Sequence, residues 1–97
     1  MEKITCWKVN FTSKAKKKLK KLSPPEQKQI LDFVFNELEK LPNPMAIGKP
    51  LNGNLKGLWR YRVGNYRIIC DIQKDILLVL VINVGHRKLI YKTQINY

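Results

Sequence analysis

Three arginines are spaced so that one surface of the protein could bind a phosphate group. Arg60 and Arg62 occur at alternate positions just before Gly64-Asn65, and Arg67 follows this dipeptide. A two-residue loop at Gly64-Asn65 predicts a β-hairpin in which Arg62 faces Arg67, with Arg60 on the same side. Like charges facing across strands destabilise a sheet, and guanidinium groups bind phosphate oxygens with paired donors. We therefore expect an anion-binding arginine patch; the alternative is a solvated face screened by Asp71.

The segment after Gly85 carries a second group of polar side chains. His86, Arg87 and Lys88 follow this glycine directly, and Tyr91 comes soon after them. Glycine permits a sharp backbone turn, so we expect these side chains to fold over the arginine patch. Taken singly, the histidine could be a surface residue and the tyrosine a packing residue. Their position beside three arginines favours a functional site.

Periodic apolar residues predict the elements that would position these groups. Period-two alternation indicates strands, recurrence at helical spacing indicates helices, and the apolar run from Ile76 to Ile82 indicates a central strand covered on both faces. Ser23-Pro24-Pro25-Glu26 has the pattern of a helix start. Strands are expected at residues 4–11, 58–63, 66–72 and 76–84, helices at 13–22 and 24–41, and a connector at 42–57. The predicted fold is α+β, in the order β-α-α-β-β-β, with a helical hairpin packed on one face of a small twisted, mainly antiparallel sheet of about four strands.

Length and charge limit the classes of protein and partner. The chain has 97 residues and a formal net charge of +12. This length predicts one domain over residues 1–97, and the charge predicts an anionic partner: nucleic acid, a membrane surface or an acidic protein. Cys6 and Cys70 form no C-x-x-C pair, and with His86 as the one histidine we expect free thiols, no metal and no cofactor. Because no stretch resembles a signal peptide or a membrane span, a cytoplasmic protein is expected.

A run of lysines lies on the first predicted helix. Its apolar stripe is narrow and lacks aromatic residues, so insertion into a membrane is not expected. One interpretation is a solvated basic face. The other is docking onto ribosomal RNA through phosphate contacts, which give affinity without sequence specificity. The docking hypothesis involves four lysines: Lys14, Lys17, Lys18 and Lys21.

The combined pattern resembles the RelE toxins of the RelE/ParE superfamily. The resemblance is carried by Leu55-x-Gly57-Leu58-Trp59-Arg60-Tyr61-Arg62-Val63-Gly64-Asn65-Tyr66-Arg67-Ile68-Ile69, then an apolar strand, then Val84-Gly85-His86-Arg87 and Tyr91. It implies a RelE-like fold and a toxin that cuts mRNA in the ribosomal A site, without a metal, by 2′-hydroxyl attack. It also implies that a cognate RelB-like antitoxin inhibits the chain.

Matching positions imply roles for individual residues. Arg67, Arg87 and Tyr91 match catalytic positions of the family, and Arg60 and Arg62 match basic positions on the first hairpin strand. RNA cleavage of this kind needs a base, stabilisation of a phosphorane and a proton for the leaving oxygen. Arginines suit the second task, and Lys88 adds a further phosphate contact. Either Tyr91 or His86 could move the proton, and the sequence leaves this choice open.

Three other functions are compatible with the sequence. One is a ParE-like toxin that inhibits gyrase by binding, without RNA chemistry. The second is a basic RNA-binding module, and the third is an inactive member of the family. The arrangement from His86-Arg87 to Tyr91 favours the nuclease. An acidic, partly disordered antitoxin is expected to bind the basic face and the exposed sheet edges.

Overall fold

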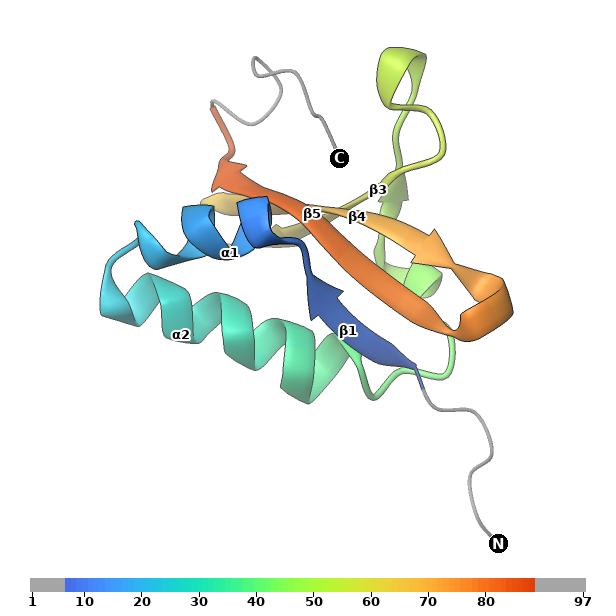
Figure 1. Ribbon diagram of the computed structural model, residues 1–97, viewed down its shortest axis with the longest axis horizontal. Coiled ribbons are helices and arrows are strands. Elements are labelled where there is room, and N and C mark those ends of the chain that lie inside the picture. The colour runs from blue at the N-terminus through green and yellow to red at the C-terminus, as the bar shows by residue number, and fades with distance from the viewer. Residues whose placement is uncertain (1–6, 89–97) are drawn as a thin grey trace, which may run out of the picture.

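The computed structural model describes residues 7–88 of the chain, in which two helices pack against a mixed five-stranded sheet (Figure 1). The spatial order of the strands is β1-β5-β4-β3-β2. The α+β prediction is confirmed. The sheet has one strand more than expected, and the additional strand is β2, which is only two residues long. The strands are β1 (Lys8–Phe11), β2 (Lys49–Pro50), β3 (Trp59–Val63), β4 (Tyr66–Gln73) and β5 (Leu78–His86).

The β3–β4 hairpin has the predicted register. Its two strands pair antiparallel, with Val63 opposite Tyr66 and Arg62 opposite Arg67. Gly64 in the turn has φ 58°, a left-handed conformation that favours glycine. β5 pairs antiparallel with β4 and parallel with β1, so it is a central strand, as its apolar sequence predicts.

Both helices begin at side-chain caps, and the cap of α2 is the one predicted from the sequence. α1 (Ser13–Lys20) starts after Thr12, whose Oγ1 accepts a hydrogen bond from the Ala15 N–H at 3.1 Å. α2 (Pro24–Asp32) starts with the predicted capping box, in which the Glu26 carboxylate accepts from the Ser23 N–H at 3.1 Å. A π-helical segment, Phe33–Leu38, continues α2.

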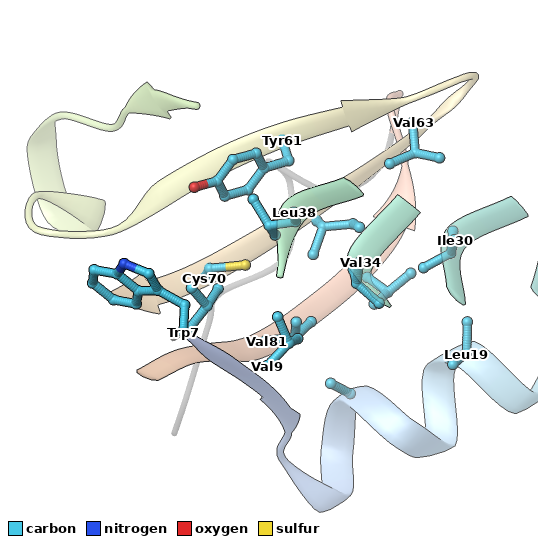
Figure 2. Close-up of a cluster of buried hydrophobic side chains, with 14 residues drawn as sticks. Trp7, Val9, Leu19, Ile30, Val34, Leu38, Tyr61, Val63, Cys70 and Val81 are labelled. Carbon is cyan, nitrogen blue, oxygen red and sulfur yellow. The ribbon is translucent and has the colours of Figure 1, made fainter. Parts of the chain in front are cut away.

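One hydrophobic core lies between the helices and the sheet (Figure 2). Apolar side chains of α1 and α2 meet the face of the sheet that carries Tyr61 and Val63. Trp7 is buried at the edge of this core, where its Nε1 donates to the Pro42 carbonyl oxygen at 3.1 Å. Beside it, Glu39 accepts a hydrogen bond from the Val9 N–H at 2.8 Å, so a side chain of the protein itself caps part of the outer edge of β1.

A second apolar cluster covers part of the opposite face of the sheet. Residues 49–57 run along this side, away from α2 (Figure 1). Leu51 and Leu55 from this segment pack with Leu58, Ile69 and Ile82. β5 is therefore covered on both faces, as predicted. The expected start of this strand was wrong by two residues, because the chain turns through Lys74–Ile76 before β5 begins, leaving Ile76 exposed.

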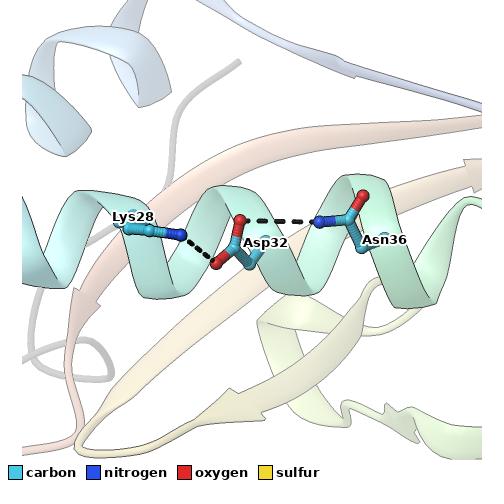
Figure 3. A network of polar contacts seen from close by, with 3 residues as sticks. All are labelled: Lys28, Asp32 and Asn36. Carbon is cyan, nitrogen blue, oxygen red and sulfur yellow. Dashed lines mark hydrogen bonds and ion pairs between the residues drawn. The ribbon is translucent and has the colours of Figure 1, made fainter.

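The outer face of α2 is polar. Lys28 and Asp32 form an ion pair at 2.9 Å across one helical turn, and Asn36 donates to the same carboxylate at 3.5 Å (Figure 3). Exposed pairs of this kind contribute little to stability. Across residues 7–88, no helix is long and apolar enough to cross a membrane.

The buried groups Cys70 and Tyr61 predict alkaline destabilisation. Burial raises the pKa of both groups above their ordinary values of 9.0 and 10.0. Above pH 9 the unfolded chain therefore loses protons that the folded chain keeps, and the free energy of unfolding falls by about 1.4 kcal/mol per pH unit for each ionising group. Urea unfolding between pH 7 and pH 10 should show this fall. In Cys70→Ala the decline should begin nearer pH 10, and an unchanged slope in this variant would contradict the prediction.

Candidate phosphate-binding site

Arg60 and Arg62 lie on the face of β3 opposite the helices, as predicted. Tyr61 and Val63 between and beside them are buried in the main core, and side chains alternate along a strand. The Arg62 side chain is exposed and Arg60 is half-buried. Arg67 pairs directly with Arg62, so two cationic side chains start from adjacent backbone positions on this open face.

Arg67 differs from its partner because it is buried, with only 7% of its surface exposed. Its Nη1 donates hydrogen bonds to the carbonyl oxygens of Gly64 at 3.2 Å and Tyr66 at 3.0 Å. These oxygens carry partial negative charge, so they offset part of the repulsion from Arg62. Arg67 therefore supports the hairpin turn as well as adding charge to the open face.

The expected sharp turn at Gly85 is wrong, because β5 continues through Gly85 to His86. Gly85 pairs with Arg67 and His86 pairs with Tyr66. Because alternate residues point to opposite faces, His86 lies on the helix side of the sheet with Tyr66, and not over the arginine patch. The two rings are 5.7 Å apart between centroids and meet edge to face at 79°. Gly85 presents no side chain on the open face beside Arg67.

A short turn at residues 86–88 follows the end of β5. The Arg87 N–H donates to the Asn65 carbonyl oxygen at 2.8 Å, which ties this turn to the tip of the hairpin. The Lys88 N–H donates to Nδ1 of His86 at 3.2 Å. The side chains of Arg87 and Lys88 are exposed. Tyr91 lies outside the described residues, so its relation to these groups stays a prediction.

Glu26 is a charged neighbour of this region that the sequence analysis did not connect with it. Its hydrogen bonds to Ser23 and Tyr66, together with the nearby charge of His86, lower the pKa of its carboxyl group. Partial burial and the bond to Glu26 raise the pKa of the Tyr66 hydroxyl. The capping box predicts the contact with Ser23, but nothing in the sequence predicts that the first turn of α2 meets the start of β4.

The lysines of α1 form a separate basic region. Lys14, Lys17 and Lys21 are exposed, whereas Lys18 is half-buried and its Nζ donates to Oδ1 of Asn83 at 2.8 Å. Desolvation and the nearby positive charges of Lys14 and Lys21 lower the pKa of Lys18. Asn83, a buried polar residue that the sequence analysis missed, thus anchors this lysine to β5.

The described geometry suits an anion better than a metal ion. Arg62 is exposed on the open face, and the turn bearing Arg87 and Lys88 is fixed to the end of the same hairpin. Arginine side chains at these places can stabilise charge on phosphate oxygens. Among residues 7–88, the histidine, cysteine and acidic side chains form no cluster of three that could hold a metal.

Comparison with known proteins gives concordant matches. The model of the family described as ParE toxin of type II toxin-antitoxin systems matches residues 9–91. Toxin RelG of Mycobacterium tuberculosis is 34% identical over 84 residues, covering 87% of this chain and 94% of that protein. Toxin RelE of the same organism is 33% identical over 84 residues, covering 87% and 84%. The crystal structure of the toxin-antitoxin complex RelBE2 from M. tuberculosis contains a chain with a TM-score of 0.79 and 32% identity, covering 86% of this chain and all of that one.

Proposed function

The chain belongs to the RelE/ParE superfamily of type II toxin-antitoxin toxins, and on that basis we propose that it is a ribosome-dependent endoribonuclease that cuts mRNA in the A site without a metal ion. The observation that carries the proposal is the facing pair Arg62 and Arg67, together with the tie that holds the Arg87 turn to the tip of the same hairpin. Cleavage of messages in this way inhibits translation.

The proposed reaction is an internal transesterification of RNA. The 2′-oxygen attacks the adjacent phosphorus and forms a new P–O bond, while the bond from phosphorus to the 5′-oxygen breaks. The 2′-hydroxyl proton passes to a base, and the departing 5′-oxygen takes up a proton. The products are a 2′,3′-cyclic phosphate and a free 5′-hydroxyl. Neither redox chemistry nor an external co-reactant is required.

The arginines are assigned to the phosphate that reacts. Arg62, Arg67 and Arg87 stabilise the extra negative charge of the phosphorane, because donors in fixed positions need little rearrangement as the charge develops. Arg60 and Lys88 bind neighbouring phosphates. Guanidinium groups stay protonated, so none of the arginines is the base. Tyr91 is the proposed base, with His86 as the alternative.

The lysines of α1 are proposed to dock the toxin on the ribosome. Lys14, Lys17 and Lys21 are exposed and can contact the phosphates of ribosomal RNA, while Asn83 holds Lys18 in place among them. Such contacts predict affinity for the ribosome that falls steeply with salt.

A RelB-like antitoxin is the proposed protein partner. The matched M. tuberculosis toxin was crystallised in a complex with an antitoxin. A net charge of +12 favours an acidic partner. Among the described strands, β2 pairs only with Trp59 and Arg60, so the edge of β3 beyond them is available for a segment that folds on binding.

Primer extension on a defined message in a reconstituted translation system tests the nuclease directly. We expect cuts inside A-site codons that require ribosomes, continue in the presence of a metal chelator and leave 5′-hydroxyl ends. An intact message in the presence of working ribosomes would overturn the proposal. Inhibition of gyrase would then identify a ParE-like toxin, and RNA binding alone would identify a basic binding module or an inactive member.

A further inference from the structure

A second pair of like charges faces across strands on the open side of the sheet. Lys49 of β2 pairs with Arg60 of β3, in the row next to the facing pair Arg62 and Arg67. Residues opposite each other in an antiparallel pair share a face of the sheet, and their Cβ atoms lie about 4.5–5.5 Å apart. Lys49 belongs to a segment expected to be an irregular connector, so only the structure reveals this pairing.

Packing against the core fixes the backbone just before Lys49. Gly48 lies so close to the ring of Tyr61 that a Cβ atom on this glycine would be 2.9 Å from the ring carbon Cζ. The ring itself is held in place, because Tyr61 is buried and its hydroxyl donates to the Pro44 carbonyl oxygen at 2.7 Å. The core residue that follows Arg60 in β3 therefore also sets the position from which the Lys49 side chain starts.

The backbone after Lys49 is fixed as well. The ring of Pro50 restricts φ, and the Leu51 N–H donates to the Leu58 carbonyl oxygen at 3.0 Å. The ammonium group of Lys49, in contrast, belongs to an exposed side chain and forms no hydrogen bond or ion pair with any residue between 7 and 88. A fixed backbone that presents an available charge is the arrangement expected of a binding residue.

We propose that Lys49 and Arg60 form a second phosphate subsite, which binds the phosphate next to the one held by Arg62 and Arg67. The two rows of side chains are two residues apart along β3, or about 6.7 Å. Consecutive phosphates of an extended RNA strand are spaced on the same scale, and basic surfaces that follow the backbone bind single strands in this way. The identity of the ligand as RNA rests on the proposed function, whereas the pairing of Lys49 with Arg60 does not.

Charge repulsion favours a phosphate subsite over a lysine that is merely solvated. Like charges that face each other destabilise a sheet, and here two such pairs lie in adjacent rows on one face. A phosphate between Lys49 and Arg60 replaces their repulsion with two attractive contacts. Contacts to phosphates fix the register of the strand and carry no preference for a base. The subsite thus places the neighbouring phosphate at Arg62 and Arg67.

A test that does not need cleavage uses a short RNA and the full-length chain. We would measure, by titration calorimetry, the affinity for a tetranucleotide with 2′-O-methyl groups, which cannot undergo attack by the 2′-oxygen. Lys49→Gln should raise Kd about 3-fold to 5-fold. The slope of log affinity against log salt should become shallower by about 0.7, the value for one phosphate contact on a single strand. Lys49→Arg should keep the affinity and the slope of the unmodified chain.

Replacing the phosphates of this RNA one at a time by uncharged methylphosphonates identifies the one that Lys49 contacts. At one linkage, the replacement should weaken binding to the unmodified chain by the same 3-fold to 5-fold and should have no such effect on Lys49→Gln. Equal effects at every linkage in both proteins would show that Lys49 contributes only to the general positive field, and would overturn the proposal.

Two control variants separate position from charge. Lys56→Gln removes an exposed lysine from the same connector and should lose the effect of no single linkage. The double variant Lys49→Gln, Asn54→Lys keeps the net charge of +12 but moves the charge to another exposed position, and should bind as weakly as Lys49→Gln. Full recovery of affinity in the double variant would overturn the proposal.

Urea unfolding tests whether Lys49 serves the fold instead. Lys49→Gln should be at least as stable as the unmodified chain, because it removes one of two facing like charges. A loss of stability in this variant would show that the lysine supports the connector, and would contradict the subsite.

Cleavage on programmed ribosomes distinguishes failure of the subsite from failure of the proposed function. If the chain binds the RNA through Lys49 as expected but leaves messages intact, the proposed function fails and the subsite stands. If the chain cuts messages and Lys49→Gln binds the RNA as tightly as the unmodified chain, the subsite fails and the proposed function stands. Failure of the unmodified chain to bind the RNA would also overturn the subsite.

Discussion

Ribosome-dependent cleavage is expected to fall by roughly 10²-fold to 10³-fold when Arg87 is replaced by alanine. Arg87 is exposed at the end of the β3–β4 hairpin, and its backbone is fixed there by the 2.8 Å bond to Asn65. The substitution removes the guanidinium group but keeps this backbone bond, so the turn itself should persist. Single-turnover cleavage of a programmed ribosome measures the effect, and the loss should appear in kcat.

Lys74→Ala is the control for loss of charge alone. Lys74 is also exposed, but it lies in the turn before β5, at the other end of that strand. The Lys74→Ala variant should cleave at the rate of the unmodified chain. The free energy of unfolding of both alanine variants should lie within about 0.5 kcal/mol of that of the unmodified chain. Arg87→Lys should recover only part of the activity, since an ammonium group lacks the planar pair of donors. Equal losses in Arg87→Ala and Lys74→Ala would show that Arg87 contributes only to the general positive field.

The hairpin could be predicted from the sequence because its register depends on neighbouring residues. Gly64-Asn65 allows one tight loop, and this loop places Arg62 opposite Arg67. The helix start at Ser23 could be predicted because its capping box also depends only on neighbouring residues. In each case a few adjacent residues determine the geometry, so the prediction needed no knowledge of the rest of the fold.

The position of His86 could not be predicted, because it depends on pairing between distant segments. A register shift between Ile69 and Cys70 changes how β4 pairs with β5, and no glycine or proline marks it in the sequence. One residue of shift reverses the face on which a side chain lies. The alternation of β5 alone therefore did not show that His86 lies beside Tyr66.

The contacts made by the connector and by Glu26 also join segments that are distant in the sequence. Leu51 and Leu55 cover the second face of the sheet from a segment whose sequence indicates only irregular structure. The capping box reveals Glu26 as a helix residue, but its bond to Tyr66 depends on how α2 crosses the sheet. The facing arginines of the β3–β4 hairpin could be predicted from the sequence, whereas these tertiary contacts could not.

Replacing Arg62 and Arg67 separately by glutamine is expected to change stability in opposite directions while lowering cleavage in both cases. Arg67→Gln removes the bonds from Nη1 to the carbonyl oxygens of Gly64 and Tyr66, so the free energy of unfolding should fall by about 1–3 kcal/mol. Arg62→Gln removes a like charge that faces Arg67, so the free energy of unfolding should rise by some tenths of a kcal/mol. Urea unfolding measures both changes.

Cleavage should decrease by at least about 10-fold in each of these two variants, because each removes a charged donor from the proposed phosphate site. Arg62→Lys serves as the control, since it keeps the charge and the repulsion and should leave stability unchanged. A gain in stability with a loss of activity at Arg62 is the result expected where a protein keeps an unfavourable charge pair for its ligand. If Arg62→Gln instead destabilises the chain and still cleaves at the full rate, the facing arginines serve the fold, and the anion must bind elsewhere.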